Sequence, residues 1–215
     1  MENTDRERAV LPYLVTGCLF WQVFYAVSYI RRDGNERHFH SKRVSNFHSI
    51  TGIIMSVANL CINNDSVFPE SIILSWGIGY FLADLIDCIV RRDFMFAIHS
   101  ILAITLLPFG WKGELYAKKA GSLAYFIEFS SPCYHKWLQS KKRSDFIVFI
   151  VTFFACRIIY VPIFFTLIGA EDNSFLMVGI ILFYLLNIAW FTKASCLLFN
   201  YKDDMDSRES YETIA

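Results

Sequence analysis

Three ionisable side chains lie inside otherwise apolar stretches between residues 79 and 100: Asp84, Asp87 and His99. An ionisable group in hydrocarbon costs roughly 2.5–3.5 kcal/mol on insertion scales, so each of them needs a physical reason to be there. Asp84 and Asp87 share one face of a helix, because side chains at this spacing are neighbours on a helix surface. A histidine can act as a general base while a carboxylate fixes its tautomer. These residues are therefore the first candidates for a functional site.

Further ionisable groups recur in apolar parts of the chain, at His48, Glu128 and Arg157. Together the set could form one polar cluster among helices, and two interpretations stay open. The cluster is either a proton-transfer or lipid-headgroup site, or a set of interhelical hydrogen bonds with one Asp–Arg pair. Holding helices together rarely needs so many titratable groups, which favours a real internal site. Asp87 lies one turn from the expected membrane edge, where it is expected to pair with Arg91.

Membrane helices must position these residues, because the chain consists mainly of apolar runs. Of its 215 residues, 55% are apolar and only 19% are charged. A helix rises about 1.5 Å per residue, so about 20 apolar residues cross a hydrocarbon core of about 30 Å. The expected spans are 9–30, 44–62, 72–90, 94–110, 114–131, 145–170 and 175–199. The polar segments between and beside them include the leader 1–8, a basic loop 132–144 and the tail 200–215. The fold class is therefore an all-α membrane protein of about seven transmembrane helices.

The charged residues and the cysteines indicate the membrane topology and which partners and metal sites the sequence gives no reason to expect. Most of the 20 lysines and arginines fall on one side if the N-terminus lies outside, so the positive-inside rule predicts an N-out, C-in topology. The formal net charge of zero gives no electrostatic case for a nucleic-acid partner. The six cysteines are scattered singly, without zinc spacing or a disulfide pattern. No metal and no resident cofactor is expected.

The expected second span carries its small and polar residues on one stripe. They follow spacings of three and four: Ser45, His48, Ser49, Gly52, Ser56 and Asn59. Residues at these spacings share one helical face. In a membrane helix such a stripe faces other helices or a wet cavity, not lipid.

An ordered series of short signals runs through the rest of the chain. It comprises Arg43-Val44-Ser45 with His48, Gly79-Tyr80-Phe81 with Asp84, Arg92-Asp93 followed by His99, Ala120-Gly121-Ser122-Leu123 leading to Glu128 and Ser130-Ser131-Pro132, Arg157 with Pro162, and Asn187 with Trp190. The series resembles the TLC domain, which ceramide synthases and translocating-chain-associating membrane proteins share. The resemblance covers roughly residues 42–198. It is strongest to the small TLC-domain-containing proteins of lipid homeostasis.

The resemblance implies a multi-pass protein of the endoplasmic reticulum. It also implies that spans two to seven form a six-helix barrel around a central polar cavity, with span one outside. His99 and Asp84 would be catalytic, and the cavity would be lined by His48, Ser45, Asp87, Glu128, Arg157 and Asn187. Ceramide synthases carry a pair of histidines in span four and a His-Asp pair in span five. Here the corresponding pairs read His99-Ser100 and Glu128-Phe129, so only one of those three histidines is present.

The expected function is therefore membrane-lipid homeostasis, in which a lipid or acyl chain is bound or modified within the barrel. A ceramide-synthase-like N-acyltransferase that uses acyl-CoA as co-substrate is the alternative, with His99 as base. A second alternative is a non-enzymatic cargo-escort or translocation-associated protein, in which the tail 200–215 recruits a protein partner. A third is a seven-helix receptor or photoreceptor, suggested by the topology and by Lys193 in the last span.

Overall fold

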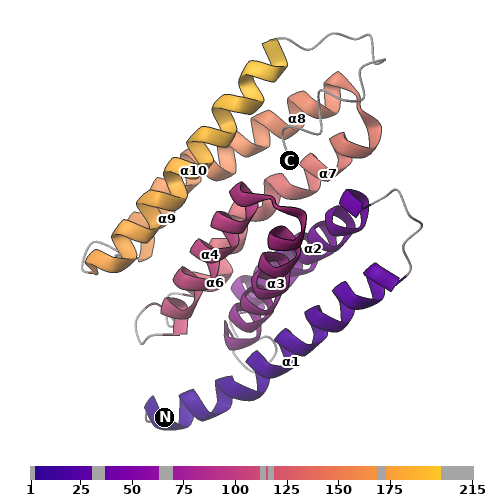
Figure 1. The fold of residues 1–215 in the computed structure, drawn as a ribbon. Helices are drawn as coiled ribbons and strands as arrows, with labels where there is room; N and C mark the ends of the chain where they lie inside the picture. Colours follow the sequence, from indigo (N-terminus) through magenta and orange to yellow (C-terminus); the bar gives the residue numbers. More distant parts are fainter. Residues whose placement is uncertain are drawn as a thin grey trace. The chain divides into compact units, whose positions relative to one another are not determined.

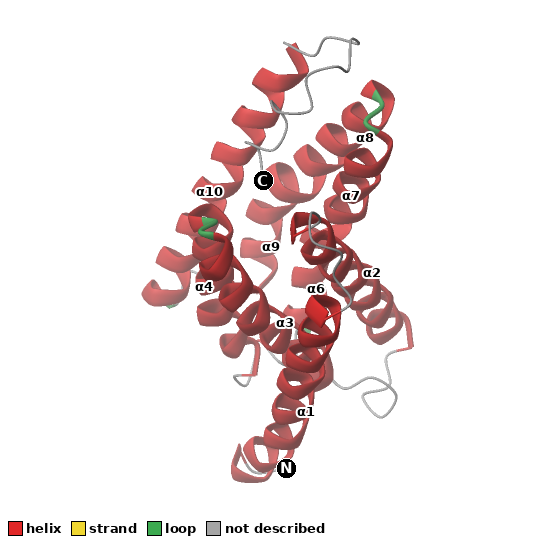
Figure 2. Cartoon of the chain, turned by 45° about the vertical axis from the view of Figure 1, so that its right-hand side comes forward, coloured by secondary structure: helices red, strands yellow, loops and turns green. Residues whose placement is uncertain are grey.

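A computed structural model describes residues 3–30, 37–62, 70–111, 115, 119–168 and 173–199. The regular structure of these residues is entirely helical, with no strand among them, as Figure 2 shows. This confirms the all-α prediction. The chain divides into two compact units, Met1–Phe126 and Ile127–Ala215, which are described separately below. The expected barrel of spans two to seven would draw helices from both units, and it stays a prediction.

The first unit is built from four long helices and short helical turns, drawn from indigo to pink in Figure 1. They are α1 (Asn3–Ile30), α2 (Arg37–Ile62), α3 (Glu70–Arg91), α4 (Phe94–Leu106), the 3₁₀ turn η1 (Leu107–Trp111), α6 (Ala120–Ala124) and the 3₁₀ turn η2 (Tyr125–Phe129), which crosses the unit boundary. Helix α3 contacts α1, α2, α4 and α6, so it is the central element of this unit.

The second unit contains α7 (Ser130–Ser140), α8 (Arg143–Phe153), the π-helical turn η3 (Phe154–Ile159), α9 (Tyr160–Ile168) and α10 (Ser174–Phe199). Helix α8 packs against both α7 and α10. The expected loop 132–144 is wrong over most of its length, because residues 132–140 are helical. Pro132 suggested a break, but it lies in the first turn of α7, where a missing N–H costs no intrahelical hydrogen bond.

Among the described residues, five helical segments are long and apolar enough to cross a membrane: Leu11–Ser28, Glu70–Arg91, Phe94–Trp111, Arg143–Ile168 and Ser174–Phe199. They correspond to expected spans one, three, four, six and seven. Helix α2 has 26 residues but carries many polar side chains, and the expected fifth span is divided between α6, η2 and α7. The count of seven spans and the N-out topology therefore stay predictions. Large apolar side chains are exposed on the spans, for example Leu19, Ile89, Ile101, Val151 and Leu185, as contact with lipid requires.

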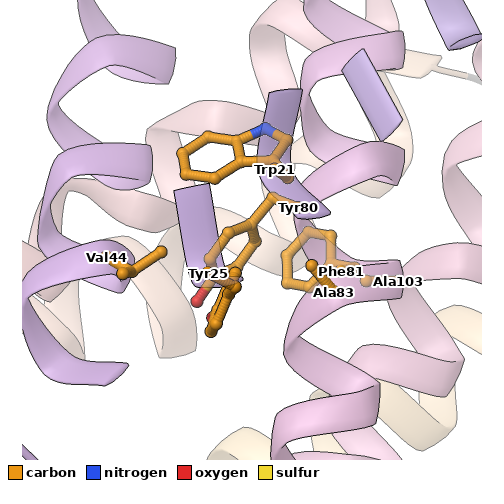
Figure 3. Close-up of a cluster of buried hydrophobic side chains, with 7 residues drawn as sticks. All are labelled: Trp21, Tyr25, Val44, Tyr80, Phe81, Ala83 and Ala103. Atoms are coloured by element: carbon orange, nitrogen blue, oxygen red, sulfur yellow. The ribbon is translucent and has the colours of Figure 1, made fainter. Parts of the chain in front are cut away.

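Helices α1 and α3 approach so closely that their glycines face each other. A Cβ atom on Gly79 would lie 2.6 Å from the carbonyl carbon of Gly17, and one on Gly17 would lie 2.7 Å from the carbonyl oxygen of Ser75. Small residues at membrane helix interfaces permit such backbone contact. Beside the glycines, the indole Nε1 of the fully buried Trp21 donates to the carbonyl of Trp76 at 3.0 Å. Figure 3 shows the cluster around this indole: Trp21, Tyr25, Val44, Tyr80, Phe81, Ala83 and Ala103.

The turn between α3 and α4 is fixed by two residues. Arg92 adopts a left-handed conformation with φ 61°, which reverses the chain after α3. Asp93 then caps α4, because its carboxylate accepts from the backbone N–H of Phe96 at 3.4 Å. Residues 92 and 93 therefore form the connection between the expected spans 72–90 and 94–110, while Arg91 is the last residue of α3. It brings the first turns of α4 back against the last turns of α3.

The helix that runs from α8 through η3 to α9 accommodates a proline by a local adjustment. Pro162 has no N–H to bond the carbonyl of Ile158, four residues earlier. The hydroxyl of Tyr184 on α10 donates to that carbonyl at 3.2 Å. The preceding π-helical turn carries Arg157 and turns it into the interior of the second unit, where it is buried. Such π turns are frequent at functional sites.

Candidate functional site

Asp84 is the centre of a buried polar network in the first unit. Its side chain is 6% exposed, and its Oδ1 accepts from the hydroxyls of Tyr25 at 3.1 Å and Tyr80 at 3.3 Å. Its Oδ2 accepts from the hydroxyl of Ser100 at 2.7 Å and from the thiol of Cys88 at 3.6 Å. Donors from α1, α3 and α4 thus converge on one carboxylate. They are all neutral, so they hold the carboxylate without a cation in direct contact.

His48 joins this network through stacked rings. The imidazole is 1% exposed and stacks on Tyr80, with ring centroids 3.7 Å apart and planes 8° apart. Its Nε2 lies 3.0 Å from the hydroxyl of Tyr125. The rings of Trp21 and Phe81 lie edge-on to the imidazole, with centroids 5.5 Å and 5.6 Å from its centroid. An acid, an imidazole and three phenols therefore occupy one continuous interior region of α1, α2, α3, α4 and η2.

The predicted polar stripe of α2 does face other helices. His48, Ser49, Ser56 and Asn59 are all buried, and Gly52 is buried with them. His48 and Asn59 make side-chain hydrogen bonds to residues of other elements. Ser45 is only half-buried, and its backbone carbonyl accepts from the hydroxyl of Ser49. The stripe prediction is thereby confirmed for the buried members.

His99 and Asp87 lie beside the network in different ways. The buried His99 on α4 has its ring edge-on to Phe81, with centroids 5.4 Å apart. Its neighbour Ser100 supplies the 2.7 Å hydrogen bond to Asp84. Asp87 forms the predicted ion pair with Arg91, at 2.7 Å between Oδ2 and Nε. That pair explains Asp87 locally and occupies the arginine nearest in sequence to Asp84.

A third buried acid in the first unit, Glu70, was missed from the sequence. Its carboxylate is 1% exposed and accepts from the backbone N–H of Ser122 at 2.9 Å, the hydroxyl of Ser122 at 2.6 Å and the amide of Asn59 at 2.9 Å. Lys119 lies next to this group, since its ammonium donates to the backbone carbonyl of Asn59 at 2.7 Å. Glu70 falls outside the expected third span, so its position gave no signal of burial.

The second unit holds a separate polar network around Arg157, which is 6% exposed. Its Nε donates to the Ser130 hydroxyl at 2.9 Å and its Nη1 to the side-chain amide oxygen of Asn187 at 3.2 Å. Its Nη2 donates to Glu128 and to the Ser131 hydroxyl, both at 3.1 Å. The guanidinium lies 5.3 Å from the centroid of the Phe153 ring. Residues of η2, α7, η3 and α10 are thus joined by one charge pair and its hydrogen bonds.

The predicted site residues therefore fall into two groups. The first unit brings together His48, Asp84, Asp87 and His99, and the second brings together Glu128, Arg157 and Asn187. The prediction of a single cavity lined by all of them stays untested.

The residues that sequence reasoning missed are mainly hydroxyl donors, namely Tyr25, Tyr80, Ser100 and Tyr125. Tyr80 was detectable in principle, because it lies one helical turn before Asp84.

The side chains of both networks suit proton transfer and hydrogen bonding. Among the described residues, no three His, Cys, Asp or Glu side chains gather in a way that could hold a metal ion.

A family model of the TLC domain matches residues 13–196. Searches of curated proteins and of solved structures return no match. The family match extends from α1 to α10 and includes both polar networks. It confirms the resemblance that the ordered motifs indicate. The chain is therefore a helical membrane protein that belongs to the TLC-domain family.

Proposed function

We propose that this protein binds a membrane lipid through the polar network around Asp84 and His48, and that it acts in membrane-lipid homeostasis. The single observation that carries the proposal is a carboxylate, an imidazole and three phenols buried together among apolar helices. A protein that only needed to hold its helices together would gain little from burying so many titratable groups.

The charges of the network favour a ligand with a hydrogen-bonding polar group. Arg91 is engaged by Asp87, while the donors that reach Asp84 within the described part of the chain are neutral. Tyrosine and serine hydroxyls both donate and accept, so they can exchange an internal partner for a lipid hydroxyl, amine or amide. Exposed apolar side chains on α1 and α4, such as Leu19 and Ile101, offer surface to acyl chains.

Comparative lipidomics of cells with and without the protein tests this proposal. Re-expression of the wild type should restore the lipid profile, and Asp84→Asn should not, because an amide presents a donor where the carboxylate accepts. The matched control is Asp87→Asn on the same helix, since Asp87 is engaged in a local ion pair. All variants must reach the membrane in equal amounts. Restoration of the lipid profile by Asp84→Asn would refute the proposal, and so would an unchanged lipid profile in cells without the protein.

A second candidate is an acyl-CoA-dependent N-acyltransferase, favoured by the buried His99 next to Ser100, which bonds Asp84. His99 would accept the proton of a lipid amine while the amine nitrogen attacks the thioester carbon of acyl-CoA. The amide C–N bond forms, the C–S bond breaks, and the proton passes from the imidazole to the departing CoA thiolate. Purified protein incubated with radiolabelled acyl-CoA and a sphingoid base should yield amide product, and His99→Ala should abolish it. Absence of product with the wild type excludes this activity.

The other expected roles gain no structural support. The tail 200–215, expected to recruit a protein partner for cargo escort, lies outside the described residues. If that role is correct, truncating the tail should impair cargo trafficking. Lys193, the candidate retinal lysine, is exposed on α10. The resemblance implies residence in the endoplasmic reticulum, which stays a proposal and is tested by co-localisation with a marker of that membrane.

A further inference from the structure

We propose that Glu70 is a positioning residue, which holds the Tyr125 hydroxyl against His48 by anchoring the helical segment that carries Tyr125. Glu70 takes no part in the network around Asp84 and is not a residue of the family motifs. Its carboxylate is nevertheless 1% exposed and makes three hydrogen bonds. Glu70 would thereby control the geometry of the proposed lipid site, and its importance for lipid binding rests on the proposed function.

Hydrogen bonds from Ser122 anchor α6 to Glu70. Glu70 accepts two hydrogen bonds from Ser122, one from the backbone N–H and one from the hydroxyl, at 2.9 Å and 2.6 Å. Ser122 lies in the first turn of α6, where backbone N–H groups lack intrahelical partners and favour a negative charge. A side chain on Gly121 would meet Glu70 Oε1 at 2.7 Å, so the backbone of α6 lies directly on the carboxylate. Glu70 therefore fixes where this helical segment begins.

The anchor at Ser122 sets the position of Tyr125. Tyr125 follows Ser122 by three residues, so the two are neighbours on the same helical surface. Its ring lies in a slot between two glycines. A Cβ on Gly52 of α2 would come within 2.0 Å of the ring, and one on Gly77 of α3 within 3.0 Å of the hydroxyl oxygen. The slot leaves the ring little lateral freedom, while the anchor at Ser122 sets how far it enters.

Tyr125 connects the anchored segment to the proposed lipid site. The Tyr125 hydroxyl lies 3.0 Å from His48 Nε2, and His48 stacks on Tyr80, which donates to Asp84. A hydrogen bond on one ring nitrogen selects the imidazole tautomer. A shift of α6 by a few tenths of an ångström would lengthen this bond and change the protonation pattern of His48. Glu70 would thus act on the site without touching it.

The test observes the His48 ring directly, in the purified full chain with isotope-labelled histidine in membrane-mimetic discs. The chain has five histidines, so the His48 nitrogen signals can be assigned with a His48→Gln variant. Tyr125→Phe defines the shift caused by loss of the hydroxyl. Glu70→Gln and Ser122→Ala should move the His48 signals in the same direction by at least half of that shift. Ser122→Thr, which keeps the hydroxyl donor, should restore them towards the wild-type position.

The matched control is Glu128→Gln, which alters the acid of the other polar network and should leave the His48 signals unchanged. Circular dichroism establishes that each variant is folded. Folded Glu70→Gln with wild-type His48 signals would overturn the inference. If Glu70→Gln does not fold, the Ser122 pair decides, and unchanged signals in Ser122→Ala overturn it. If Glu70→Gln moves the His48 signals but cells that express this variant keep a normal lipid profile, the positioning role stands and the proposed lipid site is refuted.

Discussion

Replacement of Arg157 by methionine is predicted to cost the second unit a large part of its stability. The substitution preserves the approximate length of the side chain but removes the guanidinium. That group makes four hydrogen bonds, to Ser130, Asn187, Glu128 and Ser131. The substitution also removes the cation that pairs with Glu128, whose largely buried carboxylate is 14% exposed.

The magnitude follows from these contacts. Side-chain hydrogen bonds inside membrane proteins contribute about 0.6 kcal/mol each on average, so four give about 2.4 kcal/mol. Leaving a buried polar group poorly satisfied adds about 1–3 kcal/mol. The expected loss is therefore about 3–5 kcal/mol, the range typical of breaking a buried ion pair by removing one partner.

A double-mutant cycle with Glu128→Gln separates the pair from the packing. In the wild type, Glu128→Gln should destabilise, because it removes the partner of Arg157. In the Arg157→Met background it should stabilise by about 1–3 kcal/mol, because the buried charge is then gone. Reversible unfolding in mixed detergent micelles measures the free energies. Lys193→Met on the exposed face of α10 is the control and should stay within about 0.5 kcal/mol. An additive cycle, or a loss below about 1 kcal/mol for Arg157→Met, would refute the reasoning.

Substitutions at three further positions test single structural features by the same unfolding measurement. Gly79→Val should cost about 1–3 kcal/mol or more, because its Cβ would lie 2.6 Å from the backbone of Gly17; equal stability would contradict the close α1–α3 contact. Asp93→Ala should cost about 1 kcal/mol by removing the cap of α4, whereas Asp93→Asn should cost little. Tyr184→Phe should cost about 1–3 kcal/mol, because it leaves the carbonyl freed by Pro162 without the Tyr184 hydroxyl; a neutral result would mean that another group satisfies this carbonyl.

The sequence alone determined the helical class, the family and the polar face of α2. Apolar runs of membrane length leave few alternatives to helices, because hydrocarbon offers the backbone no hydrogen-bond partners. The spacing of His48, Ser49, Ser56 and Asn59 encodes one face, and a helix converts spacing into direction without help from distant residues. The pair of Asp87 and Arg91 was predictable for the same reason, since both partners lie on one helix.

The sequence misjudged elements whose fate depends on neighbours. Residues 132–140 carry a proline and several polar side chains, yet they are helical in α7. The aromatic cluster of Trp137, Phe146 and Phe149 packs α7 against α8, and this packing outweighs local propensity. Glu70 was overlooked because its partners lie 11 and 52 residues away along the chain.

Only the tertiary structure decided which polar residues belong together. Six ionisable residues that resembled one set lie in two units. Asp84 and His48 share a polar network in the first unit, with Asp87 and His99 beside it, and Glu128 and Arg157 share another in the second. The partners of Asp84 include hydroxyls from three helices, two of them on tyrosines that sequence reasoning missed. Periodicity within one helix shows which face a side chain occupies. It cannot show which residue of another helix meets that face, because that depends on how closely the helices pack, as Gly17 and Gly79 allow α1 and α3 to do here.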